Sequence, residues 1–214
     1  MADLVTQTFE GAGIPGGWTA TGAATKDYDN VTNPLGGAQD FKITLSGNQG
    51  GLFTDFTDGN ERFAYFMFRT SALTGMDISG LRPNGSSSLR CRILLGGTGT
   101  LQVFHGATNA TTVGTLSINT AYHIWFHYNQ SAGTASVGFS TDGTRPTSGN
   151  SYASLAGGAG TTAVGRFVLG TDQANETAVV QFDNVIVADT QIGNQGGGGA
   201  SAFPHHYYAQ QRAA

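Results

Sequence analysis

Acidic residues are the first candidates for chemistry, because hydrolysis of a glycosidic bond needs two carboxylates held about 5–10 Å apart. The sequence has only three glutamates, Glu10, Glu61 and Glu176, and no two of them fall on one predicted strand. Asp27 and Asp29 are the one pair of acids at alternate positions, and they lie in a predicted loop. No Gly-x-Ser-x-Gly motif points to a serine nucleophile. We therefore expect that the protein is not an enzyme.

Two histidines and a tryptophan alternate within one aromatic stretch, at His123, Trp125 and His127. The i, i+4 spacing would bring the histidines together on a helix, but on a strand it separates them by about 13 Å, so they cannot share a metal ion. Two interpretations stay open. The three side chains pack between strands, or they line a shallow groove in which Trp125 is a stacking platform for a sugar or a protein partner.

These side chains belong to a predicted β-hairpin over residues 121–140, with Gly133 in its turn. The register follows from the apolar pattern, because pairing Ile124 with Phe139 makes one face wholly apolar and a slip of one residue would divide that face. This register leaves residues 130–133 as a loop of a common hairpin length. It places Ile124, Phe126, Tyr128, Val137 and Phe139 in the core, with Phe126 opposite Val137 and Tyr128 opposite Ala135. On the other face it pairs Trp125 with Gly138 and His127 with Ser136.

The rest of the chain supports the same fold class, because helical periodicity is almost absent and about eleven or twelve short strands can be recognised. The stretches 20–40 and 141–162 are polar and are expected to be irregular. The pattern predicts an all-β fold, an antiparallel two-sheet β-sandwich (jelly roll) with an irregular C-terminal tail. The predicted strands besides the hairpin are 3–9, 41–46, 51–56, 62–69, 88–95, 100–105, 112–118, 163–170 and 177–188.

Composition excludes several classes of partner. Charged residues are only 11% of the chain, against roughly 25% in a typical domain. The net charge is −4 and the only lysines are Lys26 and Lys42, so we expect no nucleic-acid partner, which would need a basic patch. The N-terminus shows no signal peptide, and no apolar run approaches the roughly 20 residues of a membrane span. The single cysteine, Cys91, is expected to be a buried thiol.

The composition changes after Asp189, which predicts three parts: a jelly-roll domain over residues 1–190, a Gly-rich linker over 191–201 and a tail over 202–214. A disordered tail is usually poor in aromatic residues. An aromatic cluster on a flexible tether is therefore interpreted as an anchor that docks on another subunit. The alternative is a frayed terminus or a vector-derived extension. The anchor residues are Phe203, Pro204, His205, His206, Tyr207 and Tyr208.

Several segments resemble a known fold family, the laminin-G-like, concanavalin A-like jelly roll. They are Tyr122-His-Ile-Trp-Phe-His-Tyr-Asn129, Ser136-Val-Gly-Phe-Ser-Thr-Asp-Gly143, Phe167-Val-Leu-Gly170 and Phe182-Asp-Asn-Val-Ile-Val187. The opening Thr8-Phe-Glu-Gly11 with Trp18 resembles jelly-roll carbohydrate-binding modules. The resemblance covers residues 1 to 190 and implies fold more than function, because this fold hosts lectins, glycosidases, adhesion modules and virion proteins. By analogy, similar domains with short tethered tails occur among tailed-phage structural proteins.

The resemblance also implies a structural calcium site. In similar jelly rolls a carboxylate from the first turn and an aspartate from the last strand hold a calcium ion together with backbone carbonyls. Glu10 and Asp183 occupy the matching positions here, and oxygen ligands suit this ion. The alternative is that Glu10 accepts hydrogen bonds from turn amides and Asp183 is solvated. No cofactor is otherwise required.

Two functions are therefore expected, and they are compatible. The first is a non-enzymatic phage virion component, a capsid decoration or accessory protein attached to a capsid or other virion protein through the tail, made in the host cytoplasm and located on the particle surface. The second is a carbohydrate-binding, lectin-like adhesion module that binds glycans through the His123, Trp125 and His127 face. A homo-oligomer is expected in the first case.

Overall fold

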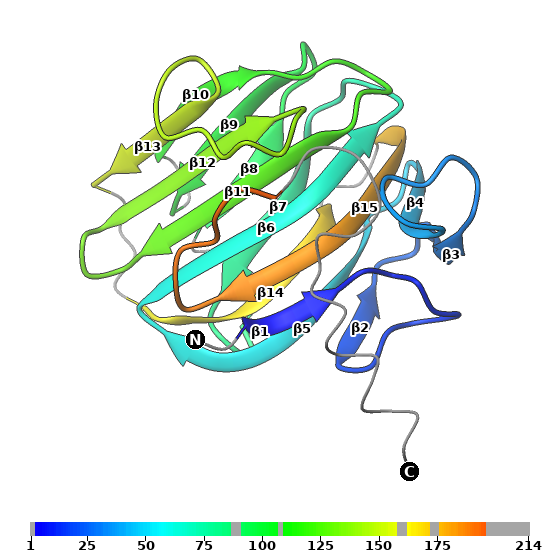
Figure 1. The fold of residues 1–214 in the computed structure, drawn as a ribbon, viewed down its shortest axis with the longest axis horizontal. Coiled ribbons are helices and arrows are strands. Elements are labelled where there is room, and N and C mark those ends of the chain that lie inside the picture. Colours follow the sequence, from blue (N-terminus) through cyan, green and yellow to red (C-terminus); the bar gives the residue numbers. More distant parts are fainter. Residues whose placement is uncertain (1–2, 87–90, 107–108, 158–161, 172–175, 196–214) are drawn as a thin grey trace.

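The computed structural model describes residues 3–86, 91–106, 109–157, 162–171 and 176–195, which form fifteen strands and no helix. The strands make two stacked antiparallel sheets, so the predicted all-β sandwich is confirmed (Figure 1). The first sheet has the order β13 (Tyr152–Ala156), β12 (Thr134–Ser140), β11 (Tyr122–Asn129), β6 (Glu61–Thr70), β15 (Thr177–Ala188), β4 (Asp40–Ser46) and β3 (Thr25–Asn30). The second has the order β10 (Asn109–Thr115), β9 (Thr100–His105), β8 (Cys91–Leu95), β7 (Met76–Arg82), β14 (Val164–Thr171), β5 (Gly50–Gly59) and β2 (Trp18–Thr21).

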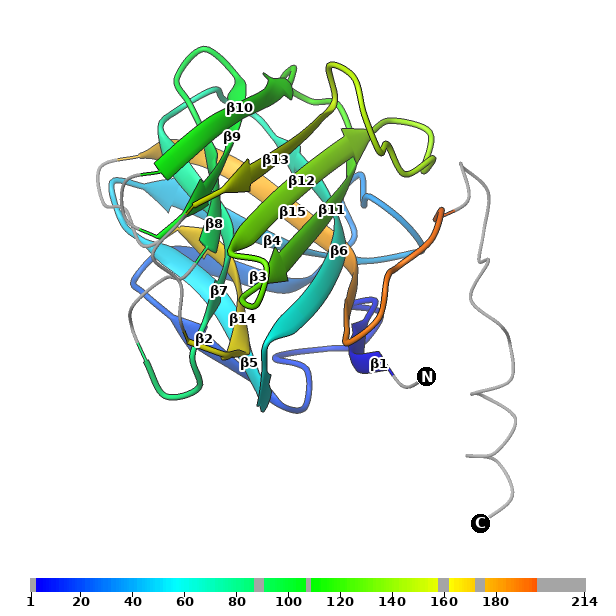
Figure 2. The same cartoon turned by 90° about the vertical axis from the view of Figure 1, so that its left-hand side faces the viewer.

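The long strand β15 organises the first sheet. Its first half pairs with β4, its second half pairs with β1 (Asp3–Gln7), and its other edge pairs with β6. A bulge between Asp183 and Ile186 separates the two halves, and Asn184 takes a left-handed backbone there with φ of 50°. Bulges bend a strand and redirect its side chains. Along one side of the sandwich β10 and β13 lie side by side, as the turned view shows (Figure 2).

The core lies between the sheets and is rich in phenylalanine. Phe66 of β6 and Phe167 of β14 meet across it with ring centroids 6.0 Å apart. Phe182 joins the same cluster beside Phe66 and Phe41. Each ring is fully buried, and burial of such a side chain contributes roughly 1.5–3 kcal/mol. Cys91 is also buried in this core as a free thiol, as the sequence predicts.

The predicted hairpin register is confirmed at each pair. Ile124 lies opposite Phe139, Phe126 opposite Val137 and Tyr128 opposite Ala135, and residues 130–133 form the loop. Four of the five predicted core residues are fully buried, and Phe139 packs half-buried against the core. His123, Trp125 and His127 therefore share the outer face of the first sheet.

Several strands differ from the prediction. The stretches expected to be irregular contain β3 and β13, and β2 and β7 were not expected either. Asp27 and Asp29 consequently lie on a strand rather than in a loop, where Asp27 pairs with Lys42 at 2.9 Å. The strand expected over 88–95 is described from Cys91. Within the described residues, no helix has the length and apolar character to cross a membrane. The tail residues Phe203 to Tyr208 lie outside the described residues.

Candidate functional site

The outer face of the first sheet carries a second apolar cluster, separate from the core. This outer cluster is made of Tyr65, Met67, Trp125, Ile186, Ala188 and Ile192, all of them buried. Five of the six come from the strands β6, β11 and β15, and Leu35 from the 31–39 loop packs against them. This arrangement explains why β6 has a nearly continuous apolar sequence, since it is covered on both faces.

Ile192 belongs to the segment that follows β15, which we call the C-terminal strap (residues 189–195). The sequence assigns residues 191–195 to a flexible linker, but the structure lays them over β11 and β6 (Figure 1). In addition to the apolar packing of Ile192, three hydrogen bonds hold the strap on the sheet. The indole Nε1 of Trp125 donates to the Gly193 carbonyl at 3.1 Å, the amide of Arg145 donates to Asn194 Oδ1 at 2.9 Å, and the amide of Gln195 donates to the Gly143 carbonyl at 2.9 Å.

The strap corrects the interpretation of Trp125 as an open stacking platform. The side chain is only 4% exposed, because the strap covers it and Tyr65 packs beside it at 5.3 Å between ring centroids. Trp125 is therefore part of the floor of this face. The prediction that the three side chains point to one face holds, but among them only His127 is half-buried, while His123 and Trp125 are buried.

The two histidines are apart, as predicted, and each has its own partner. His123 is buried and its Nδ1 lies 2.7 Å from the Tyr65 hydroxyl. Burial lowers the pKa of His123, with the charge of Asp142 acting weakly in the opposite direction. Burial also raises the pKa of Tyr65, so this pair is neutral near pH 7. His127 is half-buried, stacks on Phe63 at 4.2 Å, and places Nε2 2.9 Å from Glu61 Oε1.

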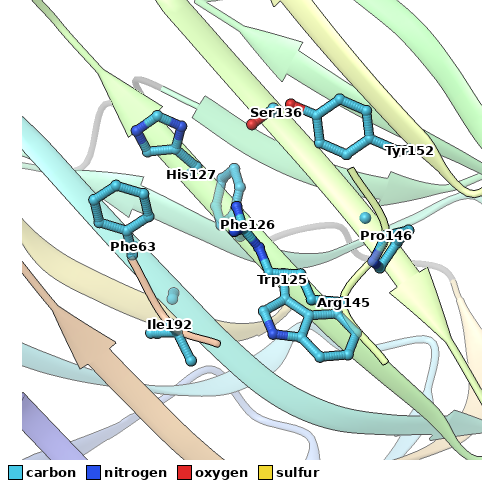
Figure 3. A pocket seen from close by; sticks show the side chains of 11 residues that line it. Phe63, Trp125, Phe126, His127, Ser136, Arg145, Pro146, Tyr152 and Ile192 are labelled. Carbon is cyan, nitrogen blue, oxygen red and sulfur yellow. The ribbon is translucent and has the colours of Figure 1, made fainter. Parts of the chain in front are cut away.

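A shallow depression opens beside the strap on the same face (Figure 3). It is open and shallow, and the empty space of about 260 Å³ at this position includes the open solvent above it. Its floor includes the Trp125 side chain, and its rim combines rings with polar groups from four strands, a loop and the strap. The rim residues are Phe63, His127, Ser136, Arg145, Tyr152 and Ile192.

The strand pairing explains how these side chains meet. Tyr152 lies opposite Gly138 in the β13–β12 pair, and Trp125 lies opposite Gly138 on its other side. Glycine at this position leaves room for Pro146, since a Cβ on Gly138 would come within 2.8 Å of the proline ring. Pro146 consequently lies on the sheet and carries the neighbouring Arg145 to the rim. The hairpin pattern alone predicted that Trp125, His127 and Ser136 share this face. It did not predict that the loop of Arg145 and Pro146 or the edge strand β13 would complete the depression.

The residues Glu10 and Asp183 are also brought together, at the 31–39 loop. The Glu10 carboxylate accepts hydrogen bonds from the Ala38 amide at 3.0 and 3.2 Å. Asp183 is 1% exposed, and its Oδ1 accepts the Asn184 amide at 2.7 Å while Oδ2 has no hydrogen-bond partner. A Cβ on Gly36 would lie 2.9 Å from that oxygen, and one on Gly37 would overlap Glu10. The lack of a side chain at Gly36 and Gly37 thus lets both carboxylates pack directly against the loop backbone.

The electrostatics of this second site suit a cation. Burial raises the pKa of Asp183 to about 8, and the carboxylates of Asp40 and Glu10 add to the increase, although the Asn184 and Gly36 amides oppose it. An unpaired buried carboxylate is costly unless a proton or a positive charge neutralises it. The described residues contain no group of three or more side chains of the His, Cys, Asp or Glu type that could hold a metal. A calcium ion here would therefore take Glu10 and Asp183, with backbone carbonyls and water completing its shell.

Comparisons with known proteins establish the fold. No family model matches the sequence, and no curated protein matches it either. Solved structures do match. A structure of botulinum neurotoxin type C, whose cell entry depends on interaction with two ganglioside molecules, superimposes with a TM-score of 0.62 at 11% identity over 89% of this chain and 48% of its own. A Trypanosoma rangeli sialidase superimposes with a TM-score of 0.56 at 19% identity, over 90% of this chain and 32% of the sialidase. Another sialidase superimposes with a TM-score of 0.58 at 12% identity, over 72% of this chain and 16% of the sialidase.

These likenesses confirm the predicted concanavalin A-like jelly roll at the level of the fold. The chain spans less than half of the length of each of these proteins, so it corresponds to one domain within them. The fold is thus one that occurs in glycan-related proteins. None of these three is a phage protein, and the link to virion proteins stays a prediction.

Proposed function

We propose that this protein is a carbohydrate-binding, lectin-like domain whose ligand occupies the depression beside Tyr152. The observation that carries the proposal is the rim itself, where half-buried rings of Phe63 and Tyr152 stand next to the Ser136 hydroxyl and the Arg145 guanidinium. Sugars present apolar C–H faces and hydroxyl groups, so they suit shallow sites that combine aromatic rings with hydrogen-bonding groups. The glycan-related proteins that share the fold support the same proposal.

We propose binding without chemical turnover. No aspartate or glutamate lines the depression among the described residues, whereas glycoside hydrolysis uses two carboxylates across the scissile bond. Glu61, which lies next to His127, is engaged by that imidazole and by Asn129 Nδ2 at 2.8 Å.

A glycan array with the wild-type chain and Tyr152→Ala tests the proposal. The control is Phe104→Ala, which removes a similarly half-buried ring from the outer face of the second sheet, under Arg92. The wild type and Phe104→Ala should bind the same glycans, and Tyr152→Ala should lose them. Loss of a sugar stacked on an aromatic side chain costs on the order of 1 kcal/mol, enough to weaken binding about fivefold. Equal binding by Tyr152→Ala, or no glycan bound by the wild type, would count against the proposal.

We also propose that Glu10 and Asp183 hold a structural calcium ion. The buried Asp183 Oδ2, which accepts no hydrogen bond of good geometry from the described residues, and the Glu10 carboxylate held against the same loop support it. Such an ion would tie the first turn and the 31–39 loop to β15. Because Leu35 of this loop packs on the outer cluster, the site would also steady the face that carries the depression.

The role on a virion surface, with attachment through Phe203 to Tyr208 and self-association, remains the proposal drawn from the sequence. Its anchor lies outside the described residues. The two proposals are compatible, since a particle can present a glycan-binding domain. Removal of residues 196–214 tests the anchor: the truncated chain should bind glycans as before and fail to attach to particles, and attachment without the tail would refute it.

A further inference from the structure

The depression differs in charge from the protein as a whole. The protein as a whole has a net charge of −4, yet the one formally charged side chain that lines the depression among the described residues is Arg145. Its guanidinium forms no ion pair with any described carboxylate. By contrast Arg92 pairs with Asp77 and Arg166 pairs with Asp55, both on the opposite sheet. Arg145 is therefore available to a ligand, while these other arginines are neutralised within the fold.

The backbone of Arg145 is held in place on both sides. Its amide donates to Asn194 Oδ1 of the strap at 2.9 Å, and the next residue, Pro146, lies against Gly138. On the same loop, Asp142 accepts the Thr144 amide at 2.9 Å, which closes a turn just before Arg145. A guanidinium on a fixed backbone loses less conformational freedom when it binds a planar anion than one on a mobile loop.

The neighbouring groups suit a sugar that carries such an anion. The half-buried Tyr152 offers a hydroxyl to sugar hydroxyl groups and the half-buried Phe63 offers a ring edge, around the same depression as Arg145 (Figure 3). A carboxylate is planar and takes two parallel hydrogen bonds from a guanidinium, which adds both energy and orientation. A neutral sugar would leave Arg145 without this partner.

We infer that the depression selects acidic saccharides, with Arg145 binding the carboxylate of a sugar acid. This inference rests on the proposed function and names the ligand class of the same site. Tyr152 binds the ring of that sugar, and Arg145 is the specificity-determining residue.

Calorimetric titration of the full chain with matched saccharides tests the inference. The probes are sialyllactose and a glucuronic-acid-terminated disaccharide, the methyl ester of each, lactose, and 3′-sulfated lactose. The ester keeps the size and shape of each acid but removes its charge. At least one acid should bind about tenfold more tightly than its ester, and the difference should shrink as salt is raised. The variants are Arg145→Gln, Arg145→Lys and, as a control for net charge, Lys26→Gln at the far edge strand β3.

The outcomes separate this inference from the proposed function. Arg145→Gln should bind acid and ester equally, Arg145→Lys should keep part of the preference, and Lys26→Gln should behave as wild type. Binding of esters and lactose as tight as that of the acids overturns the inference but leaves the proposed function intact. An equal loss of acid and ester in Arg145→Gln also overturns it, because Arg145 would then only shape the site. If sulfated lactose binds most tightly, the inference is overturned in its choice of group, because Arg145 would then recognise a sulfate rather than a carboxylate. If none of the saccharides binds and the array is also blank, both proposals fail.

Discussion

The indole of Trp125 donates its Nε1 hydrogen to the carbonyl oxygen of Gly193 at 3.1 Å. This bond joins the centre of the first sheet to a segment that follows the last strand by only a few residues. A buried indole usually finds such a partner, and here the partner is the strap. The outer face of β11 is therefore a covered apolar cluster with a depression at its border, rather than an open aromatic surface.

Ile192 is expected to hold the strap in place. Replacing it with serine should expose the outer cluster and reduce the free energy of unfolding by about 2 kcal/mol, near the lower end for a large-to-small change because the strap can move. The Trp125 emission should shift to longer wavelength as water reaches the indole. Urea unfolding and fluorescence measure both effects. Gln191→Ser is the matched control, since Gln191 is the exposed neighbour on the same strap. Equal behaviour of the two variants would mean that the strap is not anchored by Ile192.

Gly138 is expected to be essential for the rim but not for the fold. In Gly138→Val the new side chain would meet Pro146, so the 142–146 loop must move away and take Arg145 with it. Overpacking of this kind costs about 1–3 kcal/mol. Saccharide binding should fall at least tenfold while the chain stays folded by circular dichroism. Ser154→Val, on the exposed outer face of β13, should change neither property. Undiminished binding by Gly138→Val would show that the loop position is unimportant.

The calcium proposal predicts opposite effects of one substitution with and without the ion. Asp183→Asn removes the buried charge, so in the presence of a chelator it should stabilise the chain by about 1–2 kcal/mol at pH 8. The wild type should gain stability when calcium is added, and Asp183→Asn should not. Thermal unfolding at several calcium concentrations provides the measurement. Asp29→Asn is the control for loss of one negative charge. A wild type that does not respond to calcium would contradict the proposed site.

On mild acidification the folded chain should lose the contribution of His123 to its stability. Its pKa in the folded chain is lowered by burial, so between the folded value and the ordinary value near 6.5 the unfolded chain binds more protons. The contribution of His123 is thus complete above about pH 7 and is lost as the pH falls through the folded pKa. Asp183 acts with the opposite sign, because its raised pKa favours the folded chain as the pH falls below 8. The comparison is therefore made between His123→Gln and the wild type in chemical unfolding at pH 5, 6 and 7. A constant difference between the two would contradict the assignment.

The hairpin was predictable because its own residues determine its register. A slip of one residue would divide Ile124, Phe126 and Tyr128 from Val137 and Phe139, and the four-residue loop suits the alignment that the structure adopts. The strand β3 was not predictable in this way. Its sequence is polar, and it is held by its pairing with β4 and by the Asp27–Lys42 ion pair. In β7 a bulge between Asp77 and Ser79 breaks the alternation that would have revealed a strand.

The candidate site was predictable only in part. The alternation of His123, Trp125 and His127 shows which side chains share a face, but not what lies over them. The strap and the 142–146 loop reach this face through tertiary contacts, by way of Gly193, Asn194 and Pro146. Resemblance to other jelly rolls did place Glu10 and Asp183 together, and the structure brings both to the 31–39 loop.

The central claim is that a saccharide occupies the depression on the outer face of the first sheet. Nuclear magnetic resonance of the isotopically labelled chain, titrated with the glycan that binds best on the array, tests it most directly. The amide signals that shift should cluster at His127, Ser136, Arg145 and Tyr152, and the signals of Phe53 and Arg166 on the opposite sheet should stay in place. Shifts confined to the opposite sheet, or no shifts at saturating saccharide, would contradict the claim.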